Sequence, residues 1–324
     1  MIKLSVSKEI WKKSFSLAAR VIVSAIVLYF VVSLVQWENV LLAYKAADSR
    51  YIIIAVMLLS ANLGIRTFKW RSMLCSIKDA PTLSEAFGSV MLGISLGSFT
   101  PGEIGDYAGR ALHITDAKRS HLVGLTLLDK AQIFVITSAS GLISLAFLTI
   151  DNSLYTISVT IIIILLSIVI LMRLGLIADF GHHLNASFFQ KHWLTKILDG
   201  FTLLQPRQLL ITILYTMIFH IVLVLQMYFL INAFSGITLS HAFIGTSAMM
   251  FVKSLLPISL GDLGIREASS IFFFSSFGIS QAAALNASLL LFVINVFIPS
   301  AAGAYFLKHQ QLENVSFFKF MKKK

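Results

Sequence analysis

Long apolar runs, separated by short polar segments, dominate the pattern of residues along the chain. A helix needs about 20 mainly apolar residues to cross a bilayer, and runs of about 15 to 25 residues suffice when flanking residues extend the shorter ones. The pattern predicts six membrane-spanning helices, at 15–36, 51–65, 127–149, 155–172, 209–233 and 283–307. The first has the basic start of a signal peptide, but its length and the lack of a small-residue cleavage site favour a retained anchor.

Lysine and arginine predict how these helices are oriented, because basic residues gather on the cytoplasmic side of a membrane. They cluster at both termini, in 66–78 and in 173–207, whereas 151–153 carries none. We therefore expect both termini and both basic loops in the cytoplasm, with 151–153 outside. Within 174–207, apolar residues at helical spacing are mixed with basic ones, which is typical of a cytoplasmic amphipathic segment lying on the inner membrane surface.

Two further apolar segments, 83–114 and 239–278, are interrupted by glycine and proline. If each crossed the membrane once, Lys118 and Arg119 would lie outside, against the distribution of basic residues. If each enters and leaves on the same side, all basic loops stay in the cytoplasm. The sequence therefore predicts two re-entrant hairpins, the first entering from the cytoplasm and the second from outside.

The two hairpins are copies of one another. Segment 82–110 matches 238–266 without a gap, with ten identities in 29 positions, where unrelated segments of this composition give about two or three. Three predicted spans, an odd number, lie between the copies, so the second should enter from the opposite face. The expected fold is an all-α polytopic membrane protein, a single domain over 1–324, with six transmembrane helices plus two re-entrant helical hairpins. Its inverted repeat, about 10–150 and 151–310, is the plan of many transporters.

Proline and glycine mark the tip of each hairpin. Proline breaks a helix and glycine lets the backbone turn, so both tips should be unwound, as is tolerated within a bilayer only beside protein or a wet cavity. The expected tip residues are Pro101, Gly102 and Gly105 in the first copy and Pro257, Ser259 and Gly261 in the second. A helix that restarts after such a tip directs free N–H groups into the cavity, which favours an anion there.

Each tip is followed by an aspartate and, four residues later, by an arginine. This spacing places Asp106 beside Arg110, and Asp262 beside Arg266, on one helical face. One interpretation is a pair of structural ion pairs that hold the hairpins together. The other is that at least one arginine binds a substrate phosphate, because ionisable groups at this depth usually serve a substrate pathway and the guanidinium fork suits phosphate.

Three more charged residues of the hairpins complete the candidate substrate-binding set. Glu103 and Glu267 have no acidic counterpart in the other copy, which would make the two halves chemically different. Lys253 lies in the second hairpin, opposite Gly97 of the first, and could add a third positive charge.

Other charged residues lie within or next to the predicted spans. Asp129 and Lys130 lie near the expected cytoplasmic end of their span, where a snorkelling pair and a functional site are both open. Arg66, Lys69 and Arg71 follow an apolar run and are expected to contact lipid headgroups.

The composition agrees with a membrane protein and excludes other classes. Of the 324 residues, 57% are hydrophobic and only 13% charged, about half the usual charged share. This excludes a soluble enzyme, a secreted disulfide scaffold and a nucleic-acid-binding module. The net charge of +11 is attributed to basic residues in cytoplasmic loops. The single cysteine, Cys75, cannot form an internal disulfide. No nucleophile motif, phosphate-binding loop or metal cluster is present in the sequence, so no cofactor or metal is expected, and the lone His220 is expected to form an interhelical hydrogen bond.

One stretch of the second hairpin resembles a known signature. Residues 256–267 read L-P-I-S-L-G-D-L-G-I-R-E and are similar to the pattern L-P-x-S-x-G-G-x-G-x-R-E of the lysylphosphatidylglycerol synthase transmembrane-region family, also called flippase-like membrane proteins. Segment 100–106 followed by Arg110 resembles the first-half motif of that family, and 66–71 resembles the basic-aromatic end of its second span. Asp262 departs from the signature, where glycine is more common. The likeness covers about residues 10–310.

The resemblance implies an integral protein of a prokaryotic inner membrane that moves an anionic lipid or a polyprenyl-phosphate-linked precursor between leaflets. In some relatives this region is fused to a soluble aminoacyl-transfer domain, and this chain ends without one, so no such enzymatic synthesis is expected. Two rivals remain: a membrane-embedded lipid-phosphate transferase that uses Glu103, Asp106 or Glu267 as a base, and a non-transporting partner of a cell-envelope enzyme. The sequence leaves the lipid and the oligomeric state open.

Overall fold

The structure, a computed structural model, describes residues 37–98, 100–150, 152–185, 192–256 and 263–309, and among these it contains helices and no strand. Five helical stretches of this part of the chain are long and apolar enough to cross a membrane. They are α3 (Ser49–Leu74), α6 (Arg119–Thr149), α7 (Ser153–Met172), α10 (Pro206–Asn232) and Gln281–Ala304. Five of the six predicted spans are thus confirmed as helices, and the sixth, 15–36, lies outside the described residues.

The last of these stretches is interrupted inside the apolar run. It consists of α13 (Gln281–Phe292), a π-helical turn (Val293–Phe297) and α14 (Ile298–His309). A single π turn within an α-helix is rare and often accompanies a functional site. Pro299 lies two residues after this turn and cannot donate a backbone hydrogen bond.

Local capping explains where several of the spans begin. The Asp48 carboxylate accepts a hydrogen bond from the Arg50 backbone at 3.0 Å and caps α3. The Asn152 side chain does the same for α7, with bonds from Leu154 and Tyr155. Such side chains satisfy N–H groups that have no partner within the helix.

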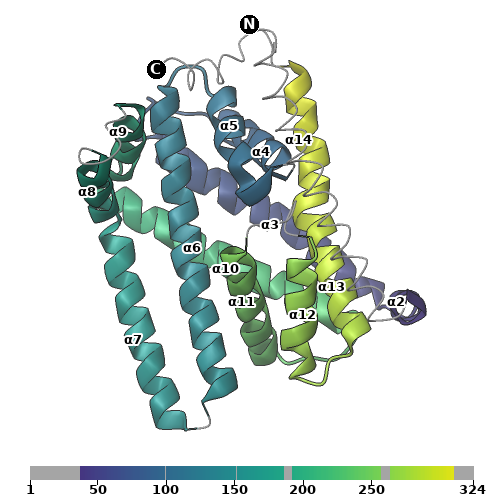
Figure 1. The fold of residues 1–324 in the computed structure, drawn as a ribbon. Coiled ribbons are helices and arrows are strands. Elements are labelled where there is room, and N and C mark those ends of the chain that lie inside the picture. Colours follow the sequence, from purple (N-terminus) through teal and green to yellow (C-terminus); the bar gives the residue numbers. More distant parts are fainter. Residues whose placement is uncertain (1–36, 99, 151, 186–191, 257–262, 310–324) are drawn as a thin grey trace, which may run out of the picture.

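Each copy of the repeat folds into two helices separated by a break. The first hairpin consists of α4 (Leu83–Ser98), the short 3-10 turn Pro101–Glu103 and α5 (Ile104–His113). The second consists of α11 (Leu239–Leu255) and α12 (Ile265–Ser275). The first helices of the two copies begin at matched leucines. In Figure 1, α4 and α5 lie near one end of the molecule, α11 and α12 near the other, and α6 runs beside both.

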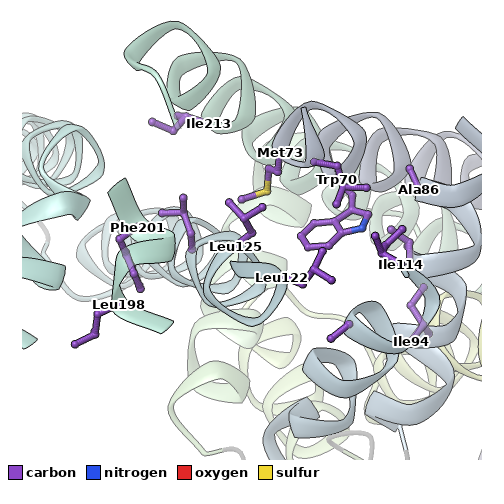
Figure 2. Close-up of a cluster of buried hydrophobic side chains, with 14 of the residues drawn as sticks. Trp70, Met73, Ala86, Ile94, Ile114, Leu122, Leu125, Leu198, Phe201 and Ile213 are labelled. Atoms are coloured by element: carbon purple, nitrogen blue, oxygen red, sulfur yellow. The ribbon is translucent and has the colours of Figure 1, made fainter. Parts of the chain in front are cut away.

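A buried apolar cluster joins the first hairpin to the spans. Figure 2 shows the Trp70 indole of α3 among Met73, Ile114 and Leu122, with Leu125 beyond them on α6. The Trp70 ring nitrogen donates to Ser89 Oγ of α4 at 2.9 Å. A second cluster packs α10 and α13 around the second hairpin, with Met227, Phe274 and Ala284 fully buried.

The polar loop between α7 and α10 contains α8 (Leu174–Leu184), α9 (His192–Leu198) and a 3-10 turn (Asp199–Thr202). Leu198 and Phe201 are buried against α6, as Figure 2 shows beside Leu125. The backbones of Gly124 and Gly200 approach so closely that a Cβ atom on either would collide with the other. Part of the apolar face that was expected to meet the membrane surface therefore packs on α6, while Phe180 of α8 is exposed.

The surface of α7 is almost entirely apolar and exposed. Its only fully buried side chains are Thr156 and Leu171, and it contacts α6 and α8. A water-exposed helix of this kind would be unstable, whereas a bilayer offers it an apolar solvent. The protein is therefore an integral membrane protein, and the part that the structure describes is all-helical.

Candidate functional site

The tip of the first hairpin has the predicted break. Gly102 and Glu103 have φ values of 56° and 54°, in the left-handed region, so the backbone reverses there instead of continuing as α-helix. Thr100 holds the turn, because its Oγ1 accepts a hydrogen bond from the Gly105 N–H at 2.6 Å and donates to the Gly97 carbonyl at 3.0 Å. Glycine suits a left-handed φ, but glutamate rarely adopts one.

The predicted pair of Asp106 and Arg110 is present and buried. Arg110 Nε donates to Asp106 Oδ1 at 2.8 Å and Arg110 Nη2 donates to Oδ2 at 3.1 Å. The third nitrogen of the guanidinium, Nη1, lies 3.0 Å from Asp129 Oδ2 on α6. The Trp70 ring covers one face of the guanidinium at 4.7 Å. All three guanidinium nitrogens and one face of this cation are thus in contact with other side chains.

These contacts belong to a longer series of alternating charges. Asp129 also pairs with Lys69 at 2.5 Å, and Asp106 also pairs with Lys130 at 2.7 Å. Lys130 then pairs with Glu103, whose other oxygen lies 4.0 Å from Lys253 Nζ on α11. The series, Lys69–Asp129–Arg110–Asp106–Lys130–Glu103–Lys253, links α3, α6 and both hairpins.

This series decides one alternative that the sequence left open and corrects one expectation. Asp129 and Lys130 are not a snorkelling pair, because each pairs with residues of other helices. Lys69 does not contact headgroups, because its ammonium is buried against Asp129. Arg71, for its part, donates to the Pro81 carbonyl at 2.8 Å. The physical reason is that α3 and α6 pass side by side with the first hairpin, so charges that look isolated in the sequence neutralise one another.

The second hairpin holds its arginine differently. Pro257, Ser259, Gly261 and Asp262 lie outside the described residues, so the predicted Asp262–Arg266 pair is not described. Arg266 Nη2 donates to its neighbour Glu267 at 2.6 Å, Nε lies 3.3 Å from Ser288 Oγ, and the guanidinium lies over the Phe292 ring at 5.1 Å. Glu267 is fully buried and accepts a bond from the Gly264 N–H at 2.6 Å, which caps α12.

Between the two hairpins lies a cavity of about 180 Å³. Its polar lining comes from both hairpins, three spans and the π turn: Asn62, Arg66, Glu103, Lys130, Thr137, His220, Lys253, Ser254, Arg266 and Asn295. Apolar side chains such as Phe219, Leu223 and Met250 complete the wall. The volume is far above the 10–15 Å³, roughly, that admits one water, yet below the ~300–1,000 Å³ of pockets that enclose drug-sized ligands.

Positive charge dominates this lining. Among its described residues, Arg66, Lys130, Lys253 and Arg266 are cations, and Glu103 is the one carboxylate. Arg66 projects from the middle of α3 and forms no hydrogen bond or ion pair with any residue that the structure describes. A guanidinium in a cavity of low dielectric without a direct carboxylate partner is costly, so the cavity is suited to an anion.

Neutral polar groups in the wall are fixed by hydrogen bonds. His220 Nε2 lies 3.2 Å from Ser247 Oγ, which confirms the expected interhelical bond. The side-chain amides of Asn295, on the π turn, and Gln226 form two hydrogen bonds with each other, at 2.8 and 3.2 Å. The described residues contain no group of three or more histidines, cysteines or acids that could hold a metal.

The candidate residues therefore divide into two groups. Glu103, Lys253 and Arg266 face the cavity. Asp106 and Arg110 lie behind the first tip, where they line smaller recesses, and Glu267 is buried beneath Arg266. Sequence reasoning missed Arg66, Lys130 and Asn295 as cavity residues. The available signal was a charged or amide side chain within or next to an apolar run, which by itself does not distinguish a cavity from a lipid interface.

Comparison with known proteins agrees with this architecture. Residues 17–303 match the family described as the lysylphosphatidylglycerol synthase TM region, and the chain belongs to this family. No curated protein and no solved structure matches the chain.

Proposed function

We propose that this member of the family moves a lipid with an anionic headgroup between the two leaflets of the membrane. The headgroup binds in the central cavity, and its acyl or prenyl chains remain in the bilayer. The observation that carries the proposal is Arg66, a guanidinium in the cavity wall without a carboxylate partner among the described residues. Arg266, Lys130 and Lys253 face the same space from three other elements.

The chemistry of these groups favours phosphate. A guanidinium offers parallel N–H donors that match two oxygens of a phosphate, and ammonium groups add charge without strict direction. The cavity volume of about 180 Å³ admits a headgroup and not a whole lipid. Family membership supports a role that involves membrane lipids.

Transport requires that the cavity open to each side in turn, and the repeat offers a means. We propose that the two halves are inverted copies, each with a hairpin entering from its own side, and that one half rocks against the other. Both termini would then be cytoplasmic, in a prokaryotic inner membrane. Support comes from the first helices of the two hairpins, which begin at matched leucines, and from the places of the hairpins at opposite ends of the molecule (Figure 1).

We propose transport without covalent chemistry. The three carboxylates that could serve a transferase as a base are Glu103, Asp106 and Glu267, and each is ion-paired with a lysine or arginine. Such pairing stabilises the ionised form and weakens the carboxylate as a proton acceptor.

The test is movement of a labelled anionic lipid between leaflets of vesicles that contain the purified protein. Arg66→Gln removes the unpaired charge without leaving a carboxylate behind, so the fold should persist while movement falls by about tenfold or more. Arg50→Gln, at the exposed start of the same helix, is the matched control and should move lipid like the parent protein. Equal rates for the parent, Arg66→Gln and Arg266→Gln would disprove the proposal, and a covalently altered lipid would favour a transferase.

A further inference from the structure

Glu103 occupies an unusual position in the cavity. It is the one carboxylate among the described lining residues, and 43% of its side chain is exposed to the cavity space. Its backbone has φ 54°, although it is not a glycine. Non-glycine residues in this region are held there at a cost and gather at functional sites. With this backbone conformation the carboxylate lies among the cavity cations.

The partners of Glu103 are themselves candidate binding groups. One carboxylate oxygen pairs with Lys130 of α6, and the other lies 4.0 Å from Lys253 of α11. This carboxylate therefore bridges the first tip to the second hairpin, which Figure 1 shows to come from opposite ends of the molecule. The contact with Lys253 is long and partly solvated, so it is weak enough to be exchanged.

We propose that Glu103 is an internal counter-anion. It contacts Lys130 and Lys253, the lysines that bind the headgroup, while the cavity is empty, and the headgroup displaces it. This inference rests on the proposed function and adds the competitor that the headgroup must replace. When a phosphate binds Lys130 and Lys253, Glu103 is released and the ionic link between the first tip and α11 is broken. When the headgroup leaves, Glu103 returns to both lysines and restores that link.

Displacement also defines a class of headgroup. A phosphodiester carries one negative charge and gains little by replacing one carboxylate. A phosphomonoester carries about 1.5 to 2 negative charges at neutral pH and three strong acceptor oxygens. Its additional charge and its three oxygens suit simultaneous contact with Lys130, Lys253 and Arg66. The preferred substrates are lipids that end in a phosphomonoester or diphosphate.

Binding to the full-length protein in a zwitterionic detergent tests the inference. The probes are short-chain phosphatidic acid, a monoester, and short-chain phosphatidylglycerol, a diester, each titrated by calorimetry. The parent protein should bind the monoester more tightly. Glu103→Gln removes the competitor, so affinity for phosphatidic acid should rise about threefold to tenfold. In vesicles the same variant should move the lipid more slowly, because nothing displaces the headgroup.

Two further variants make the outcome decisive. Glu103→Gly also removes the charge, and glycine suits the left-handed backbone, so this variant should fold even if the glutamine variant does not. Glu38→Gln, at an exposed glutamate of α2 (Trp37–Lys45), controls for the loss of one negative charge. If the parent binds neither probe and Arg66→Gln changes nothing, the proposed function fails. If the parent binds phosphatidic acid but both Glu103 variants bind it equally or more weakly, the counter-anion role alone is overturned.

Discussion

The two hairpins share ten of 29 aligned residues, yet they hold their arginines in different ways. In the first, Arg110 is enclosed by Asp106, by Asp129 of α6 and by the Trp70 ring. In the second, the one carboxylate that Arg266 contacts among the described residues is its own neighbour Glu267, and its guanidinium also faces the cavity. The repeated arginine therefore has a different role in each copy. Arg110 fixes the first hairpin to the spans, and Arg266 reaches the cavity.

The two hairpins also differ in the size of the residues where their two helices meet. In the first, a Cβ atom on Gly93 of α4 would collide with the Asp106 carboxylate and with Arg110 Cγ, and one on Gly109 of α5 would collide with the backbone of α4. The matched residues of the second copy are Met249 and Ile265. Glycines thus let α4 and α5 approach closely around their ion pair, whereas the matched positions of α11 and α12 carry the larger side chains of Met249 and Ile265. The first hairpin is built as a rigid anchor and the second as a holder of cavity charge.

The largest expected effect comes from breaking the ion series of the first hairpin. Asp129→Asn leaves Arg110 with one carboxylate and Lys69 with none among the described residues, both buried. Removing one partner of a buried ion pair usually costs about 3–5 kcal/mol of unfolding free energy. Denaturant unfolding of the purified protein in detergent measures the loss.

The second hairpin supplies the comparison for that measurement. Glu267→Gln keeps an oxygen for the Gly264 N–H and leaves Arg266 in contact with Ser288 and the cavity. The loss should be smaller, about 1.5–3 kcal/mol, which is the range for hydrogen bonds to charged groups. A larger loss for Glu267→Gln than for Asp129→Asn would reverse the assigned roles.

The sequence was sufficient to predict the helices and the breaks, for clear physical reasons. An apolar run such as 155–172 is expected to form a membrane-spanning helix, because a helix satisfies its own backbone hydrogen bonds in a bilayer. The observed helix α7 (Ser153–Met172) follows the prediction within two residues. A proline followed directly by a glycine in the middle of an apolar segment disfavours a continuous helix, so the first tip at Pro101 and Gly102 was also predictable. The four-residue spacing was enough to pair Asp106 with Arg110.

The sequence did not reveal where charges meet across helices. The predicted span 51–65 was stopped before Arg66, whereas α3 continues to Leu74, and α6 begins at Arg119, eight residues before the predicted span 127–149. Helix periodicity is local, and it does not show that Lys69 on one helix faces Asp129 on another. The same limit hid Arg66, which looks like a headgroup contact until α10 and the hairpins enclose it.

Close packing of the first hairpin gives an intermediate effect. Gly93→Ala places a methyl group against the Asp106–Arg110 pair, and overpacking of this kind costs about 1–3 kcal/mol. Gly64→Ala in α3 is the matched control, because nothing lies within 4 Å of its Cβ position and alanine is the better helix former by about 1 kcal/mol. Thermal unfolding should therefore show a lower midpoint for the first variant and an equal or higher one for the second. Equal midpoints for both would mean that α4 and α5 can separate freely.

The smallest effect lies at the entrance of the first hairpin, outside the five spans. Glu85 pairs with Lys78 at 2.5 Å and forms a capping box with Thr82, whereas the matched residue of the second copy is His241. The Lys78 ammonium, with the Thr82 N–H, lowers the pKa of Glu85 to about 2, against about 4.3 for an unperturbed glutamate. A lowered folded-state pKa stabilises the protein above the unfolded value, and this stabilisation is lost as pH falls towards 2. The free energy of unfolding of the parent should therefore exceed that of Glu85→Gln by no more than about 1 kcal/mol near neutral pH. This difference should shrink as the pH falls from about 4.3 towards 2, so the unfolding curves of the two proteins should converge there. Glu38→Gln, an exposed change of the same kind, should show no such convergence, and convergence there would assign the effect to net charge instead of to this pair.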